Sequence, residues 1–164
     1  MAETDRAIRI RHEPKPGDLG MVVHLHGLLY AREYGLDASF EPYVAKPLAE
    51  FAMQVAGRLW IAERDNRVVG SVAMVDARAG EGQLRWFLLV PEVRGSGLGH
   101  RLLETALVYG RERGFGRIFL WTFADLAAAR GLYERAGFRI TETKTVLVWG
   151  AERTELRMDL ELAV

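Results

Sequence analysis

The chain has 164 residues, of which 49% are hydrophobic and 27% are charged. This length and balance predict one globular domain over residues 1–164 and exclude a disordered chain. Its 22 basic residues equal its 22 acidic residues, so no positive excess favours nucleic acid as a partner. The absence of cysteine excludes a disulfide framework, a cysteine nucleophile and a thiolate metal site.

The polar start of the chain, residues 1–10, contains no apolar segment typical of a secretory signal. No apolar run approaches the ~20 residues that span a bilayer. We therefore expect a cytoplasmic protein without a membrane partner. The spacing of the four histidines indicates no metal site.

In the first third of the chain, alternating apolar and charged residues predict a strand over residues 6–11. Two helices are then expected, over residues 19–34 and about 40–56. Asp18 can cap the first of them, and Gly35 is a typical residue at which such a helix ends.

The remaining two thirds alternate between strand and helix patterns. The expected strands are 60–63, 68–75, 84–90, 117–122, 139–149 and 154–162. The expected helices run from the glycine-rich turn at 94–99 to about residue 113, and from about 126 to 136. Gly137 follows the second helix, where a left-handed C-terminal residue belongs. This order predicts a mixed α/β fold with a central sheet and helices on both faces.

The glycine-rich turn joins the buried strand 84–90 to the next helix. The first turn of a helix offers unpaired N–H groups and the positive end of the helix dipole. Gly95, Gly97 and Gly99 leave room for a phosphate, while Ser96 adds a hydroxyl and Arg94 a charge. The turn therefore indicates a phosphate or pyrophosphate site, although a purely structural turn is the alternative.

Two common nucleotide motifs fit this turn poorly. A dinucleotide fingerprint requires glycine where His100 stands, and it normally follows the first strand of its domain. A P-loop requires a lysine, which the turn lacks.

A family resemblance gives a better match. Arg94, Gly97 and Gly99 resemble the central motif of the GCN-related N-acetyltransferases, in which Arg or Gln is followed by two residues, Gly, one residue, and then Gly or Ala. A second segment, Ala-x-x-Leu-Tyr-Glu-x-x-Gly-Phe over residues 129–138, resembles another motif of that family. Residues 25–36, LHGLLYAREYGL, are similar to acetyltransferase domains fused to MarR-type regulators.

The resemblance implies a mainly antiparallel sheet in which one central strand pair splays apart. It also implies acetyl-coenzyme A as co-substrate, with no metal. The pantetheine arm would contact the backbone of Leu88, Leu89 and Val90. The pyrophosphate would lie on the backbone amides of Arg94, Gly95, Ser96, Gly97, Leu98, Gly99 and His100.

In the same comparison Tyr133 matches the tyrosine that protonates the departing thiolate. A phenol can do so without a strongly altered pKa, because a thiolate is a good leaving group. Residues that would line the acceptor pocket follow at helical spacing: His26, Tyr30, Glu33 and Tyr34. Glu81 and Glu92 are weaker candidates for the general base, which the sequence does not identify.

One position departs from the family pattern. Leu126 stands where many relatives carry an asparagine that contacts the pantetheine. This leaves open how the arm is held.

The sequence thus predicts transfer of an acetyl or other acyl group to a primary amine by direct attack. Two other readings stay open: a non-catalytic acyl-coenzyme A sensor and a nicotinamide oxidoreductase. The acceptor could be a small molecule or a peptide amine. The alternating strand 154–162 could pair across a homodimer.

Overall fold

The computed structural model describes residues 7–54 and 56–163 and is built on a seven-stranded sheet. The strand order is β1-β2-β3-β4-β5-β7-β6. All neighbouring strands are antiparallel except β4 and β5, which are parallel. The strands are β1 (Arg9–Arg11), β2 (Gly57–Arg64), β3 (Arg67–Asp76), β4 (Glu81–Leu89), β5 (Arg117–Phe123), β6 (Arg139–Val148) and β7 (Ala151–Glu161).

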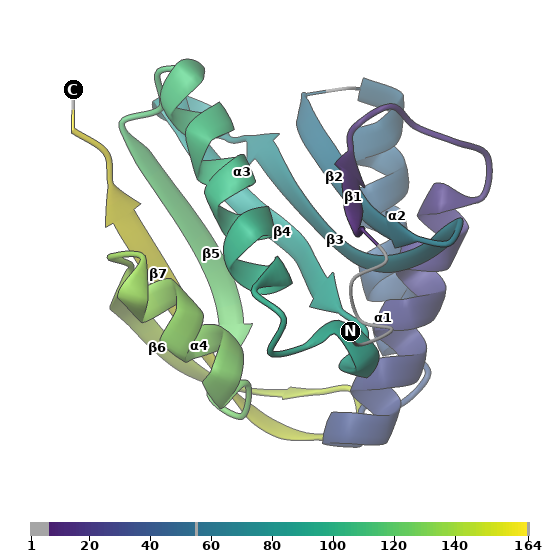
Figure 1. Cartoon of the computed structure of the whole chain (residues 1–164). Helices are drawn as coiled ribbons and strands as arrows, with labels where there is room; N and C mark the ends of the chain where they lie inside the picture. The colour runs from purple at the N-terminus through teal and green to yellow at the C-terminus, as the bar shows by residue number, and fades with distance from the viewer. Residues whose placement is uncertain (1–6, 55, 164) are drawn as a thin grey trace.

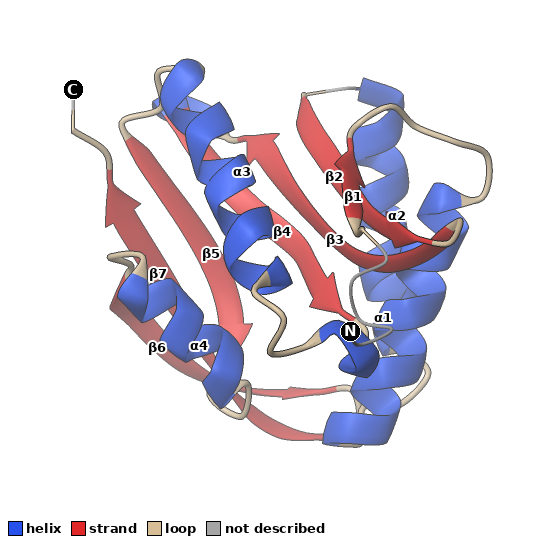
Figure 2. Cartoon of the chain, in the orientation of Figure 1, coloured by secondary structure: helices blue, strands red, loops and turns tan. Residues whose placement is uncertain are grey.

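Helices cover both faces of this sheet (Figures 1 and 2). The α-helices are α1 (Asp18–Tyr34), α2 (Phe40–Gln54), α3 (Leu98–Glu112) and α4 (Ala127–Arg135). Two 3-10 turns, η2 (Arg78–Gly80) and η3 (Pro91–Val93), flank β4. The mixed α/β fold with helices on both faces is therefore confirmed.

Each sheet face carries its own hydrophobic core. On one face, Leu102, Leu103 and Ala106 of α3 pack against strand residues that include Met74 and Ile118. The other core joins α1 and α2 to β2, β3 and β4. Its buried residues are Val22, Leu36, Phe40, Val44, Leu48, Ile61, Ala73, Trp86 and Trp149. The central strands are thus fixed from both sides.

Most expected elements are present, with some bounds corrected. The predicted strand 60–63 was too short, because β2 extends over eight residues. Pro47 lies inside α2 without ending it. The capping role expected of Asp18 is wrong: Asp18 is the first residue of α1, and its buried carboxylate accepts two hydrogen bonds of 2.8 Å from Arg11. Residue 6, where the first strand was expected to begin, lies outside the described residues.

Candidate functional site

The central feature of the site is that β4 and β5 pair along only part of their length. Three register pairs join them, at Glu81–Arg117, Gly82–Ile118 and Gln83–Phe119. Beyond Gln83 the two strands diverge toward their carboxyl ends (Figure 1). The later part of β4 therefore presents backbone groups that no neighbouring strand uses on that side. The splayed strand pair expected from the sequence is confirmed.

A β-bulge reshapes β4 beside this opening. Arg85 pairs with Ala73 and Leu88 with Ser71, so two residues of β4 lie opposite one residue of β3. Trp86, the first bulged residue, has a positive φ of 48°, which is strained for a bulky side chain. The hydroxyl of Ser71 donates a hydrogen bond of 2.7 Å to the Trp86 carbonyl. This contact stabilises the bulge from the neighbouring strand.

At the mouth of the opening lies the glycine-rich turn. Gly95 and Gly97 have φ values of 75° and 85°, and Gly97 precedes the first residue of α3. A Cβ on either glycine would meet no atom within 4 Å, so the space beside them is open. Gly99 differs, because its Cβ would approach a Leu89 methyl group to 3.1 Å.

The backbone N–H groups of this turn are free over six consecutive residues. Within the described part of the chain, the amides from Gly95 to His100 donate to no backbone or side-chain acceptor, and the first helical bond of α3 starts at Arg101. No acidic side chain occupies the first turn of α3. Free amides at the positive end of a helix form an anion-binding cradle.

Two side chains of the turn form hydrogen bonds with other residues of the protein. The guanidinium of Arg94 forms an ion pair with Glu33 of α1 and donates to the Leu89 carbonyl, at 3.0 Å from Nη2. The hydroxyl of Ser96 donates to the Val93 carbonyl. The turn therefore faces the open space mainly with its backbone.

The opening, the turn and α1 surround one cavity of about 560 Å³. All four acceptor-pocket residues predicted on α1 line it, as does Tyr133 of α4. Gly95, Gly97, Gly99 and His100 line its other end. The structure thus brings together residues that lie about 100 positions apart in the sequence.

Tyr133 is buried between aromatic rings, with Phe87 and Phe138 at centroid distances of 5.8 and 5.9 Å. Its hydroxyl forms no hydrogen bond with any described residue. Burial, and to a lesser extent the nearby Tyr30, raises the pKa of the Tyr133 phenol. Tyr133 is therefore a protonated hydroxyl at neutral pH, facing a cavity.

On α1, His26 and Tyr30 are stacked, with ring centroids 5.7 Å apart. Nδ1 of His26 lies 2.8 Å from the Val22 carbonyl oxygen, to which it donates as Nδ1–H. Burial lowers the pKa of His26 from its ordinary 6.5 to about 4, so the ring is neutral. The hydrogen bond with Arg94 lowers the pKa of Glu33. Both groups are therefore weak bases.

Among the residues predicted for the pantetheine arm, Leu88 and Leu89 line the cavity. The N–H of Val90 donates to the Val69 carbonyl at 2.9 Å. The weaker base candidates Glu81 and Glu92 do not line the cavity. Leu126 does line it, and as the N-cap of α4 it supplies no side-chain hydrogen bond to that helix.

The sequence interpretation missed several residues that line the cavity. These are Phe40, Tyr43, Arg85, Trp86, Trp121, Phe123 and Glu155. For one of them a signal was available, because Arg85 is the one charged residue in the apolar run 84–90. Neither the bulge nor the aromatic residues of α2 carry a comparable local pattern.

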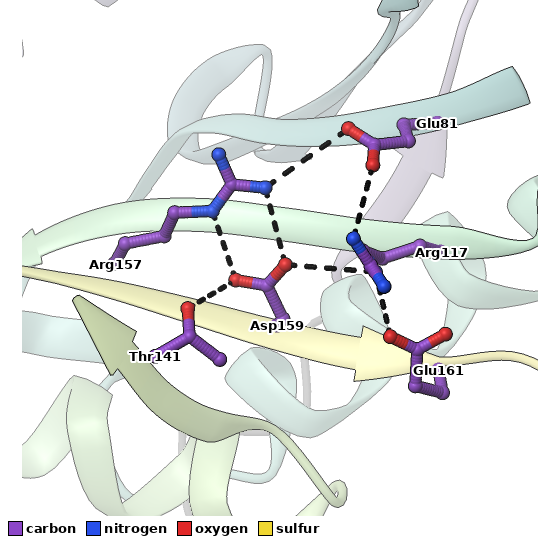
Figure 3. A network of polar contacts seen from close by, with 6 residues as sticks. All are labelled: Glu81, Arg117, Thr141, Arg157, Asp159 and Glu161. Atoms are coloured by element: carbon purple, nitrogen blue, oxygen red, sulfur yellow. Dashed lines mark hydrogen bonds and ion pairs between the residues drawn. The ribbon is translucent and has the colours of Figure 1, made fainter. Parts of the chain in front are cut away.

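At the opposite, paired end of β4 and β5, ionic contacts link four strands (Figure 3). Asp159 of β7 accepts hydrogen bonds of 2.9 and 3.1 Å from Arg157 and of 2.6 Å from Thr141 of β6. Arg117 of β5 bridges Glu81 of β4 and Glu161 of β7, at 3.3 and 2.6 Å. This network fixes the closed end of the strand pair.

Together, a central sheet that opens between two parallel strands and an anion cradle at the opening define the class of fold used by acyl-coenzyme A-dependent transferases. A family model described as "Acetyltransferase (GNAT) family" matches residues 27–138, well over half of the chain. The chain therefore belongs to the GNAT acetyltransferase family and is an N-acetyltransferase of that type.

Several relatives support this assignment. The uncharacterized N-acetyltransferase YjgM of Escherichia coli is 34% identical over 113 residues, covering 65% of this chain and 68% of YjgM. Human N-acetyltransferase 8B is 34% identical over 95 residues, covering 55% of this chain and 42% of that protein. The chain thus spans only about half the length of its vertebrate relatives.

Solved structures show the same fold over nearly the whole chain. A GNAT-family acetyltransferase structure from Desulfovibrio desulfuricans has a TM-score of 0.78 and 23% identity, covering 96% of this chain and 100% of that one. The structure of yncA from Salmonella typhimurium, with its cofactor acetyl-CoA, has a TM-score of 0.77 and 20% identity, covering 96% and 95%. No helix in residues 7–54 and 56–163 has the length and apolarity needed to cross a membrane.

Proposed function

We propose that this protein transfers an acetyl group from acetyl-coenzyme A to a primary amine by direct attack, with Tyr133 as the general acid. The observation that carries the proposal is the row of six free amides, Gly95 to His100, beside the unpaired part of β4. A Cβ at Gly95 or Gly97 would fill the space that a diphosphate needs. The relative yncA has the same fold and binds acetyl-CoA.

Acetyl-coenzyme A supplies the acyl group as a thioester. The amides of the turn bind and neutralise its diphosphate, assisted by the dipole of α3. On the side that faces β5, the backbone of Leu88 and Leu89 orients the pantetheine arm toward the cavity, apart from the Leu89 carbonyl, which Arg94 already binds. A backbone N–H of the bulged strand can donate to the developing oxyanion.

The neutral amine attacks the thioester carbonyl, the C–S bond breaks as the C–N bond forms, and the nitrogen releases a proton to solvent. Tyr133 donates its phenolic proton to the departing thiolate sulfur and is then reprotonated from solvent. Burial raises the pKa of the phenol, which keeps it protonated at neutral pH, so the proton moves only as the sulfur becomes negative. The aromatic walls of the cavity, including Tyr30 and Phe40, exclude water around the attacking amine. The absence of cysteine, the commonest nucleophile that carries an acyl group, supports direct attack.

The test is a panel of primary amines and peptides incubated with acetyl-coenzyme A, with free thiol as the readout. We expect thiol release that requires the amine and a product heavier by one acetyl group. Acetyl-coenzyme A binding without turnover of any amine would instead support the non-catalytic sensor. Binding of a nicotinamide dinucleotide, detected by thermal shift, would favour the oxidoreductase reading.

Two narrower expectations belong with this proposal. The similarity of residues 25–36 to acetyltransferase domains fused to MarR-type regulators stays a prediction, because the relatives named above do not bear on it. A homodimer also stays a prediction. The expected pairing of strand 154–162 across that dimer is wrong, because β7 is already paired with β5 on one side and β6 on the other.

A further inference from the structure

Arg85 is a cation in the cavity without an anionic partner. Its side chain is half-buried, and it forms no hydrogen bond or ion pair with any residue that the structure describes. Its guanidinium carbon lies over the ring of Trp86, 4.6 Å from the centroid, within the range of a cation–π contact. This contact leaves the N–H donors of the guanidinium edge unused.

The bulge explains how Arg85 comes to face the cavity. Arg85 pairs with Ala73, which belongs to the core beneath α1 and α2, and Trp86 belongs to that core as well. Two consecutive residues of β4 therefore point to the same face, which a regular strand does not allow. Both line the cavity a few residues before the unpaired backbone at Leu88 and Leu89.

The carboxylates that line the cavity are already paired. Two carboxylates line the cavity in the described part of the chain, Glu33 and Glu155. Glu33 is bound by Arg94, and Glu155 lies 3.4 Å from the ammonium of Lys144. Neither is bound to Arg85, so the protein does not neutralise its charge within the described residues. Arg135 of α4 also lines the cavity without an ion pair among those residues, but Arg85 is the one that lies beside Trp86 in the bulge of β4.

A half-buried cation without a partner is unfavourable unless a ligand supplies the opposite charge. Burial also lowers the pKa of Arg85, which shows that its surroundings disfavour the charged form. The planar guanidinium is suited to bidentate hydrogen bonds with a carboxylate. Tyr43 and Phe40 add an apolar wall on the same side.

We infer that Arg85 binds a carboxylate of the acceptor, so that the substrates are amino acids or other amines that carry a carboxylate. The inference rests on the proposed function, because it names the acceptor class of that reaction. The acceptor would place its carboxylate on Arg85, its apolar part against Trp86 and Tyr43, and its amine toward the opening of β4 and β5.

The experiment uses amino acids paired with their carboxamides, such as phenylalanine with phenylalaninamide, leucine with leucinamide and glycine with glycinamide. Thiol release from acetyl-coenzyme A gives kcat/KM for each member. We expect the wild-type protein to favour the acid of a pair by about 10- to 100-fold, as charge-assisted hydrogen bonds allow. Arg85→Met should remove this preference and leave the KM for acetyl-coenzyme A within about twofold.

Arg58→Met is the matched control. Arg58 also lies over an aromatic ring, 5.0 Å from the centroid of Tyr109, but it does not line the cavity. The Arg58→Met variant should keep the wild-type preference for the acid over its carboxamide. Equal rates with acids and amides, or a preference that survives Arg85→Met, would overturn the inference while leaving the proposed function intact.

Absence of turnover with every amine would overturn the proposed function. The carboxylate site would then be tested by ligand binding instead of by kinetics. Calorimetry would then measure association of phenylalanine and phenylalaninamide with the coenzyme A-loaded protein. Binding of the acid alone, lost in Arg85→Met, would support the carboxylate site without catalysis. Equal or undetectable binding of both would overturn it.

Discussion

The two ends of the β4–β5 strand pair differ in how their polar groups are used. At the closed end, three register pairs and a network of arginines and carboxylates join the strands, and the polar side chains of that network bind one another (Figure 3). At the open end, six amides of the turn, the Tyr133 hydroxyl and the Arg85 guanidinium have no hydrogen-bond partner among the described residues.

We infer from this difference that the closed end of the strand pair contributes mainly to stability and the open end mainly to function. Unused polar groups that are held out of water weaken a fold, so they persist where a ligand supplies the missing partners. The closed end offsets that weakness by fixing four strands to one another. Changes at the closed end should therefore alter mainly stability, and changes at the open end mainly binding and turnover.

The largest effect is expected from Tyr133→Phe at the open end. Removing the hydroxyl removes the proton donor for the thiolate while keeping the ring that packs on Phe87 and Phe138. We expect kcat to fall by about 100-fold, within the range of general acid catalysis. The KM for acetyl-coenzyme A should change little.

Steady-state kinetics of Tyr133→Phe and Tyr109→Phe form the comparison. Tyr109 packs on Trp60 within the same hydrophobic core but does not line the cavity. Equal activity in the two variants would contradict a catalytic role for Tyr133.

Asp159→Asn tests the closed end. The Asp159 side chain is only 9% exposed, and its loss of charge removes one of the two anions, Asp159 and Glu81, that Arg157 and Arg117 share. We expect the free energy of unfolding to fall by about 2 kcal/mol, because both arginines retain some solvent access. Denaturant unfolding measures this change.

Glu104→Gln is the control for Asp159→Asn, because Glu104 and Arg111 form a pair that is about half exposed. Such surface pairs contribute less than about 0.5 kcal/mol in most proteins. If the two variants lost equal stability, the closed end would not have the role assigned to it.

The neutral His26 makes the open end sensitive to acid. Its pKa of about 4 in the folded protein lies below the ordinary 6.5, so the unfolded chain binds more protons between these values. Stability should therefore fall as the pH decreases from 7, with a contribution from His26 of roughly 2 kcal/mol at pH 5.

Unfolding of the wild-type protein and of His26→Leu at pH 7 and pH 5 isolates that contribution. The change in the free energy of unfolding between pH 7 and pH 5 is measured for each protein, and one change is subtracted from the other. This subtraction cancels the contribution of acidic groups elsewhere, such as Asp18, which also make the fold less stable in acid. An identical pH dependence in both proteins would show that His26 is not a neutral buried group.

The smallest effect is expected from Gly95→Ala in the turn. Gly95 and Gly114 both have φ of 75°, and a Cβ on either would meet nothing within 4 Å. Alanine at either position should therefore destabilise the fold by a similar amount, about 1 kcal/mol. Only Gly95→Ala should weaken acetyl-coenzyme A binding, by about tenfold, because its methyl group enters the cradle.

Calorimetric titrations of the Gly95→Ala and Gly114→Ala proteins with acetyl-coenzyme A give this difference. Similar affinities in both would place the diphosphate away from the turn.

The parts of the molecule that the sequence predicts well are those with local causes. Gly35 and Gly137 have positive φ at the ends of α1 and α4, where only glycine fits without strain. The free amides of the turn follow from its position before a helix.

The parts that the sequence misses depend on distant partners. Nothing local requires Trp86 to adopt a positive φ, which is fixed by the hydroxyl of Ser71 in the neighbouring strand. The pairing of Arg94 with Glu33 joins residues 61 positions apart. The sequence alone does not reveal the bulge, so it cannot place Arg85 in the cavity. It also does not reveal the ion pair with Arg94, which makes Glu33 a weak base.

The most direct test of the account compares coenzyme A with pantetheine, which lacks the diphosphate, in calorimetric titrations of the wild-type protein. If the amides from Gly95 to His100 bind the diphosphate, coenzyme A should bind at least about tenfold more tightly, and the difference should shrink as salt is raised. Equal affinities, or no association with coenzyme A at all, would contradict the account.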